Sequence, residues 1–325
     1  MIVDLPSTTT SSINRQLVDM RERGGAIALG RVLTLVISTD DDHAEDAIEA
    51  ANDASREHPC RVLVVARGSK RGSSRLDAQI RVGGDAGASE VLVLRLYGEL
   101  ADHGDAVIVP LLLPDAPVVV WWPGQAPAVP SRNPLGTMAT RRITDSAAGT
   151  RPARTLKRLA ADHAPGDTDL AWTRLTHWRA LLAAALDQPP YEVVTRATVS
   201  GASDSPSTEL LAAWLAHALR CPVTRVRTVA GGGMSAVRLE RKSGPVELVR
   251  LQGAVAVLSQ PGQPDRRISL PRRALRDCLA EELRRLDPDD VYSEVLTKGL
   301  ARLAREPGAE RGSRAMKTAQ PEGER

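Results

Sequence analysis

The sequence predicts an α/β fold with a mainly parallel N-terminal sheet and flanking helices, followed by a second α+β domain with a mixed or antiparallel sheet. Three observations predict it. In the first part of the chain short apolar runs alternate with helical periodicities, as in βαβ units. In the last part short alternating stretches are joined by glycine-containing turns, which is typical of antiparallel hairpins. The length of 325 residues exceeds what one hydrophobic core usually supports, so two domains are expected.

The first domain is expected to span residues 1–122. A helix capped by Ser11 or Ser12 opens it, and a second helix carries an apolar stripe from Ala44 to Ala54. Apolar or alternating stretches predict five strands, at 31–38, 60–66, 76–82, 90–96 and 118–122. The basic loop 67–75 between two of them, with Arg67, Lys70, Arg71 and Arg75, is either a phosphate-binding loop or a solvated surface loop.

The most apolar stretch runs from Ala106 to Gly124. Three prolines and Asp115 interrupt it, so it predicts no membrane-spanning helix. A short helix over about 105–113, a turn at Pro114-Asp115 and a buried strand at Val118–Trp122 fit it better. Trp121 and Trp122 are expected to point to opposite sides of the sheet, because side chains alternate along a strand.

Residues 123–167 are expected to connect the two domains, since proline, glycine, serine and threonine are frequent from 123 to 150. The pair Arg141-Arg142 in this connection either clamps an acidic group of a partner or holds Asp145. The second domain, residues 168–304, is expected to begin with a long helix from Asp169 to Asp187.

Tryptophan and arginine are concentrated on that helix. Arg174 and Trp178 are four residues apart and Trp172 and Arg179 are seven apart, which favours cation–π stacking. The same residue types are enriched in interface hot spots. The helix is therefore either a partner contact or a structural helix packed between the domains, with its tryptophans filling the junction.

A strand at 191–200, a loop of small residues and a helix with Pro206 in its first turn follow. This loop predicts either an anion site or ordinary capping of the helix by Ser205; the candidate anion-binding residues are Ser200, Gly201, Ser203 and Ser205. Four strands near 223–229, 235–241, 246–251 and 254–259 and helices at 271–286 and 289–303 complete the domain. Residues 305–325 are expected to be disordered.

Composition and motifs exclude several function classes. A net charge of +3 is too small to indicate nucleic acid or an anionic membrane as partner. No secretory signal is visible and the three cysteines are isolated, which indicates a reduced cytoplasm. No GxGxxG follows the first strand, and no P-loop, GxSxG or metal-binding spacing occurs, so no catalytic residue, cofactor or metal is expected.

Several uncommon blocks occur in one order along the chain: Arg31–Val36, the run LLLPDAPVVVWWPG at 111–124, Asn133–Gly136, Arg141–Ser146 and Asp169–Arg179. With these blocks the chain resembles the glucose-6-phosphate dehydrogenase assembly protein family, OpcA, to about Leu303. The resemblance implies a non-enzymatic factor that binds glucose-6-phosphate dehydrogenase and favours its active oligomeric state. The alternative is a sugar-phosphate-binding enzyme or sensor that uses the Ser200–Ser205 loop.

A partner surface is expected where the two domains meet, because four of the five tryptophans lie in two of these blocks. The residues predicted to form it are Trp121, Trp122, Arg141, Arg142, Asp145, Trp172, Arg174, Trp178 and Arg179.

Overall fold

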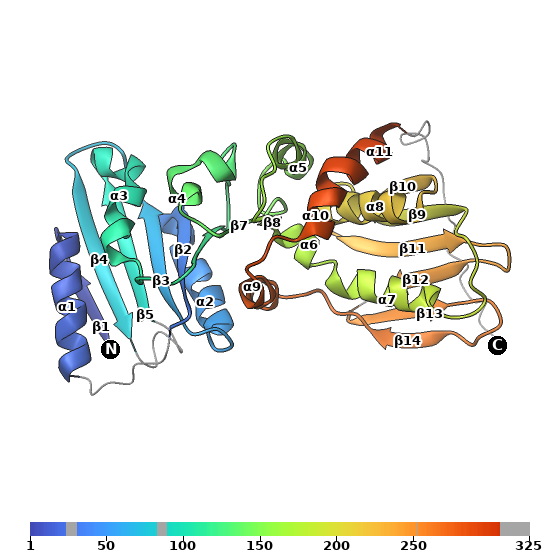
Figure 1. Ribbon diagram of the computed structural model, residues 1–325, viewed down its shortest axis with the longest axis horizontal. Helices are drawn as coiled ribbons and strands as arrows, with labels where there is room; N and C mark the ends of the chain where they lie inside the picture. Colours follow the sequence, from blue (N-terminus) through green and yellow to red (C-terminus); the bar gives the residue numbers. More distant parts are fainter. Residues whose placement is uncertain (24–30, 83–89, 252, 306–325) are drawn as a thin grey trace, which may run out of the picture.

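The computed structural model describes residues 1–23, 31–82, 90–251 and 253–305. It contains two β-sheets, each with its own helices, that lie side by side along the long axis of the molecule (Figure 1). The fold class predicted from the sequence is confirmed. The expected disorder of residues 305–325 concerns a segment that, after residue 305, falls outside the described residues.

The first sheet has eight strands in the order β1-β4-β5-β3-β2-β6-β7-β8. They are β1 (Ile2–Leu5), β2 (Leu33–Asp40), β3 (Cys60–Arg67), β4 (Arg75–Val82), β5 (Glu90–Tyr97), β6 (Val118–Trp122), β7 (Arg141–Thr144) and β8 (Asp167–Asp169). The strands from β5 to β8 are parallel, and β4 and β1 are antiparallel additions at one edge. All five strands expected in this part are present.

Helices cover the two faces of this sheet, since its central strands are apolar on both sides. On one face α1 (Thr10–Arg23) and α3 (Gly104–Ile108) pack against one set of alternating strand residues. On the other face α2 (Ala44–Ser55) packs together with α9 (Leu275–Arg284), which belongs to the C-terminal part of the sequence. The chain therefore returns to the first sheet after building the second.

The second sheet has six strands in the order β10-β9-β11-β12-β13-β14, parallel between β10 and β9 and antiparallel elsewhere. They are β9 (Arg196–Ala202), β10 (Val223–Thr228), β11 (Met234–Glu240), β12 (Val246–Arg250), β13 (Val255–Ser259) and β14 (Arg266–Ser269). The core lies on one face, against α7 (Thr176–Leu186), α8 (Pro206–Leu219), α10 (Asp290–Glu294), a π-helical turn at 295–299 and α11 (Leu300–Arg305) (Figure 1).

Two expectations about the middle of the chain are wrong. The connection expected at 123–167 carries α4 (Pro134–Thr137) and α5 (Pro152–Ala161), and β7 and the first residue of β8 lie within it as strands of the first sheet. The long helix expected from Asp169 is two helices, α6 (Leu170–Thr173) and α7, separated at Arg174-Leu175. Asp169 caps α6, because its carboxylate accepts the amide of Ala171.

Candidate functional site

The two adjacent tryptophans of β6 lie on opposite faces of the first sheet, as predicted. Trp121 packs with the α2 and α9 side, and Trp122 packs with the α1 and α3 side. Trp121 is 0% exposed and Trp122 is 2% exposed. Both indoles are therefore part of the core, and neither forms a protruding contact at the end of the strand.

The arginine pair of β7 is also buried, and each arginine has its own carboxylate. Arg141 donates to Glu282 of α9 with its Nε at 3.0 Å and its Nη2 at 2.5 Å, and to the carbonyl of Asp287 at 2.6 Å. Arg142 pairs with Asp167 and donates to the carbonyls of Ala139 and Pro165. The alternative in which this pair holds Asp145 is wrong, because both guanidinium groups are paired with other carboxylates of the chain. The alternative in which the pair clamps an acidic group of a partner stays a prediction.

Asp145 is held by Arg174 instead. The two guanidinium nitrogens of Arg174 lie 2.8 and 2.6 Å from the two carboxylate oxygens of Asp145, which is a bidentate pair. Asp145 is buried, and the Arg174 side chain retains 28% exposure. The pair joins the loop after β7 to the break between α6 and α7.

A second buried carboxylate, Asp169, lies beside this pair. It accepts hydrogen bonds from the hydroxyl groups of Thr144 and Ser146 and from the amides of Ser146 and Ala171, at 2.7 to 3.2 Å. Burial, followed by the charge of Asp145, raises the pKa of Asp169 to about 7. The hydrogen bonds oppose this shift, but a fully buried carboxylate near a second one retains its proton more readily.

The tryptophans of the α6–α7 segment are buried as well. Trp172 donates its indole N–H to Asp289 at 2.8 Å, and the Arg179 guanidinium lies 3.7 Å from the centre of its ring, so the predicted Trp172–Arg179 stacking is confirmed. Trp178 is stacked 5.0 Å from Arg250 of β12. The expected neighbour of Trp178, Arg174, forms its ion pair with Asp145 instead.

The residues predicted to form a partner surface thus meet at the junction between the two sheets, but seven of the nine are buried. Arg174 and Arg179 are half-buried. Compositional enrichment in tryptophan and arginine does not distinguish an interface from a polar core, because both bury aromatic rings and pair guanidinium groups. The predicted exposed partner face is therefore corrected to an internal, ion-paired junction.

Of the four candidate anion-binding residues, only Ser205 lines a cleft. Ser200 lies on the face of β9 that points away from the helices. Gly201 packs against Thr208, and Ser203 is exposed in the turn. The Ser205 hydroxyl lies 3.4 Å from the amide of Thr208, so Ser205 caps α8. A cavity of about 360 Å³ begins at this cap, and Arg174, Arg250, Arg272 and Arg273 line it.

Sequence reasoning missed three of these arginines. Arg250 ends β12, and Arg272 and Arg273 lie in the segment before α9 that was expected to be helical. The local sequence does not reveal this, since a proline is favoured in the first turn of a helix and Pro271 is therefore compatible with the expected one. Nothing in the sequence places that segment next to β12.

The open face of the second sheet, opposite the helices, presents a row of residues in register across all six strands. The row joins Val226, Ser200, Ala236, Val249, Val257 and Arg267 as successive cross-strand partners. All six are half-buried or exposed. Val249 at its centre is 37% exposed, and Leu251 beyond the end of β12 is 44% exposed. This face is mainly apolar along the row.

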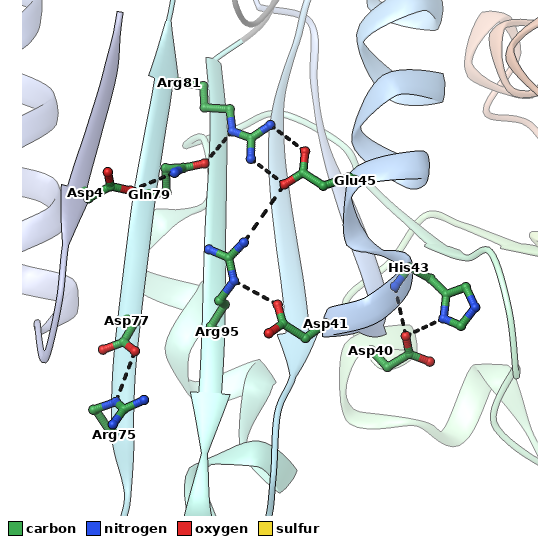
Figure 2. Close-up of polar contacts among 10 residues, drawn as sticks. All are labelled: Asp4, Asp40, Asp41, His43, Glu45, Arg75, Asp77, Gln79, Arg81 and Arg95. Atoms are coloured by element: carbon green, nitrogen blue, oxygen red, sulfur yellow. Dashed lines mark hydrogen bonds and ion pairs between the residues drawn. The ribbon is translucent and has the colours of Figure 1, made fainter.

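The first sheet also has strands that extend beyond its helices, but their surface is charged. Beside α2, Arg81 forms a bidentate pair with Glu45 at 2.9 and 2.6 Å, and Arg95 pairs with Asp41 at 2.8 Å (Figure 2). Gln79 links Arg81 to Asp4 on the edge strand (Figure 2). These charges are matched, and the carboxylates of Glu45 and Asp41 are 61% and 40% exposed, so this surface has the character of a solvated face.

The basic loop 67–75 belongs to the same solvated surface. Lys70 pairs with Asp102 at 2.6 Å, and Arg75 pairs with Asp77 at 3.0 Å and stacks on Tyr97 (Figure 2 shows the Arg75–Asp77 pair). Arg67 and Arg71 are exposed.

The three cysteines, Cys60, Cys221 and Cys278, are buried. Burial raises the pKa of Cys278 to about 11, so its thiolate is scarce at neutral pH. Among the described residues no group of three or more His, Cys, Asp or Glu is placed to hold a metal ion. No helix in the described ranges has the length and apolar character needed to cross a membrane.

Two family models match the chain. One, described as glucose-6-phosphate dehydrogenase subunit N-terminal domain, matches residues 51–161, and the other, described as the C-terminal domain of the same subunit, matches residues 165–296. Together they cover about three quarters of the chain. No sequence match was found among curated proteins.

Solved structures give only distant likeness. Glucose-6-phosphate 1-dehydrogenase from Mycobacterium avium is 11% identical with a TM-score of 0.40, over 86% of this chain and 93% of that one. UDP-N-acetylglucosamine 3-dehydrogenase GnnA from Acidithiobacillus ferrooxidans is 9% identical with a TM-score of 0.36, over 84% of this chain and 97% of that one. Scores this low do not establish a common fold.

Proposed function

Because the chain belongs to the glucose-6-phosphate dehydrogenase assembly protein (OpcA) family, we propose that it is a non-enzymatic factor that binds glucose-6-phosphate dehydrogenase and favours its active oligomeric state. The single observation that carries this proposal is the match of both subunit domains, in order, over residues 51–161 and 165–296. The proposal places the protein in the pentose phosphate pathway and in a reducing cytoplasm.

The activation we propose is a population shift. A protein that binds the active oligomer more tightly than the inactive form shifts the equilibrium by the ratio of the two affinities. Such a factor needs no reacting group of its own. It needs a surface large enough for a stable and selective contact.

The open face of the second sheet is the surface we propose for this contact. Neighbouring strands lie about 4.8 Å apart, so six strands present a face roughly 24 Å wide. A standard interface buries about 800 Å² on each partner, so we propose this face as the centre of the contact, with surrounding residues completing it. Its apolar row through Ala236, Val249 and Val257 lies beside an ion-paired row in which Arg238 bridges Glu240 and Glu247. Apolar patches gain free energy on docking, and charged groups around them add selectivity.

The test mixes the dehydrogenase with the parent protein, with its Val249→Lys variant or with its Val18→Lys variant. For each mixture, gel filtration measures binding and an enzyme assay measures the activity of the dehydrogenase. Val18 lies on α1 of the other sheet and is 49% exposed, so it is a matched control for placing a lysine at an exposed valine. We expect the parent to co-elute with the dehydrogenase and raise its activity. Val249→Lys should weaken binding at least about tenfold, because it buries a charge at the centre of an apolar contact, while Val18→Lys binds like the parent.

Melting temperatures of both variants show whether either substitution acts through folding. If the parent changes neither the elution nor the activity of the dehydrogenase, with and without substrate, the proposed function is wrong. If the parent binds and Val249→Lys binds equally well, the function stands and the proposed surface is wrong.

A further inference from the structure

The cleft beside α8 carries more positive charge than its surroundings neutralise. Four arginines line it, against one lining carboxylate, Asp204, which is held by a backbone amide and retains its negative charge. Both oxygens of Asp204 lie 3.1 Å from the amide of Gly231, and they hold the glycine turn between β10 and β11 in place. Gly231 and Gly233 have φ values of 80° and 64°, a backbone conformation that favours glycine.

Two of the four arginines are neutralised by carboxylates outside the cleft. Arg174 is paired with Asp145 on both nitrogens. Arg273 pairs with Glu281 at 2.5 Å and also donates to the carbonyl of Thr173 at 2.8 Å. These two side chains form part of the wall, and their charges are compensated.

Arg250 and Arg272 differ, because backbone carbonyls are their hydrogen-bond acceptors among the described residues. Arg250 donates to the carbonyl of Leu270 at 3.1 Å, and to those of Met234 and Pro271 at 3.5 Å. Arg272 donates to the carbonyls of Gly231 and Gly232 in the glycine turn. No carboxylate in the described part of the chain forms an ion pair with either one. With Asp204 as the one remaining carboxylate of the lining, the cleft keeps a net positive charge at this end.

Arg250 lies in a partly desolvated environment, and the positive charge of Arg272 acts on it. Burial, and after it the charge of Arg272, lowers the pKa of Arg250 from its usual value. Arg250 is also stacked on Trp178, which fixes the plane of its guanidinium group. A guanidinium group that is held in place and repelled by a like charge gains free energy when a dianion comes between the two.

The rest of the cleft is apolar and small. Leu175, Trp178, Pro206 and Met234 contribute its apolar wall. A volume of about 360 Å³ lies at the lower end of the range of about 300 to 1,000 Å³ found for small-molecule sites. An inorganic anion would leave most of this space and its apolar wall without a contact.

We propose that this cleft binds a small phosphorylated organic molecule, with the phosphate between Arg250 and Arg272 and the organic part against the apolar wall. Guanidinium groups match the geometry of phosphate oxygens, and hydrogen bonds to charged groups are the strongest of their kind. The assignment rests on the arginines and the cavity and is independent of the dehydrogenase. Ligand binding here gives the chain a sensor for a phosphate ester.

The experiment measures thermal shift and calorimetric affinity of the isolated full chain. The probes are three phosphate esters: glucose 6-phosphate, ribose 5-phosphate and adenosine 5′-monophosphate. Inorganic phosphate and glucose serve as controls, because each represents only one of the two groups that a phosphate ester joins. We expect at least one ester to raise the melting temperature more than either part does at the same concentration. Arg272→Gln should raise the Kd of that ester at least about tenfold, because it removes one charged donor.

Arg56→Gln is the matched control, since it removes the same charge from a side chain that is 73% exposed and lies next to α2. It should bind the ester like the parent. Arg250→Lys is the second variant, because it retains the charge and loses the two-pronged geometry, and it should also weaken binding.

Three results overturn the proposal. They are the absence of a shift with any ester, an equal shift with inorganic phosphate alone, and unchanged affinity in both Arg272→Gln and Arg250→Lys. Because the dehydrogenase is absent from these measurements, each result leaves the assembly function untouched.

Discussion

Arginine serves two different purposes in two regions of this molecule. On β7, Arg141 and Arg142 are 4% and 7% exposed, and each faces a carboxylate brought from a distant part of the chain. In the cleft beside α8, Arg250 and Arg272 lie nearer to solvent and have carbonyl oxygens as acceptors. The residue type is the same, and the difference is whether the protein supplies the opposite charge.

This difference indicates which arginines maintain the fold and which are available to a ligand. A guanidinium group removed from water must be paired, because an isolated buried charge costs many kcal/mol. A guanidinium group that is still partly hydrated needs no internal partner, so its charge can be neutralised by an incoming anion. Removing a β7 arginine should therefore affect folding, and removing a cleft arginine should affect binding.

The largest effect is expected for Arg141→Ala. It leaves Glu282 buried without its cation, and breaking a buried pair in this way costs about 3 to 5 kcal/mol. The matched control is Arg284→Ala, which removes the Arg284–Glu57 pair, another link between α9 and the α2 region, whose side chains are 60% and 56% exposed. That variant should lose at most about 1 kcal/mol.

Urea denaturation of the two variants and the parent measures this difference. The double variant Arg141→Met with Glu282→Leu sharpens it, because two apolar side chains remove both charges and should restore most of the lost stability. Equal losses in Arg141→Ala and Arg284→Ala would show that the β7 arginines have no special role in the fold.

The second prediction concerns the pH dependence of stability at the same junction. The pKa of Asp169 is about 7 in the folded protein and about 3.8 for the ordinary side chain. Between these values the folded state binds the proton and the unfolded state does not, so stability falls as pH rises from about 4 to about 7. Above pH 7 this contribution no longer changes, because both states have released the proton.

Asp169→Asn should remove this slope, since an amide at that position cannot ionise. Thr144 can accept from the new amide while it donates to the carbonyl of Thr168, which lies 3.0 Å away. Melting temperature measured from pH 5 to pH 8 follows the effect, and Asp102→Asn, at an exposed carboxylate, serves as control. A slope unchanged in Asp169→Asn would assign the pH dependence to another group.

The sequence was sufficient to predict the helices and strands whose own pattern of apolar and polar residues shows which side is buried. The apolar strands from β2 to β6 and the alternating strands of the second sheet were predicted because burial on one or both faces leaves a periodic pattern. Opposite placement of Trp121 and Trp122 followed from strand geometry alone. Helix α8 was predicted from Pro206 and its serine cap.

The elements that depend on distant partners were not predictable. Arg141 and Arg142 give β7 the composition of a loop, and they are compatible with a buried strand only because Glu282 and Asp167 lie beside them. The break at Arg174 likewise accompanies its pair with Asp145. Pattern reasoning treats a charge as exposed, so it fails where the compensating charge comes from another part of the chain.

The cleft was missed for a related reason. Arg250 and Arg272, the two cleft arginines without an ion pair among the described residues, end β12 and precede α9. They are 22 positions apart in the sequence, and the fold brings them to one cavity. The predicted anion loop did lie at its rim, but through Ser205 alone. Residue types can suggest an anion site. Which charges inside it are paired can be known only from the folded structure.

The smallest effect is expected for Arg272→Gln on stability in a buffer free of phosphate. This exposed side chain contacts backbone carbonyls only, and surface substitutions of this kind usually change the free energy of unfolding by less than about 0.5 kcal/mol. The sign should be neutral or slightly stabilising, because the variant also removes the repulsion between Arg272 and Arg250. Urea denaturation beside Arg141→Ala measures both ends of the comparison in one experiment. A loss comparable to that of Arg141→Ala would mean that Arg272 maintains the glycine turn, and the distinction between paired arginines for folding and unpaired arginines for binding would not hold.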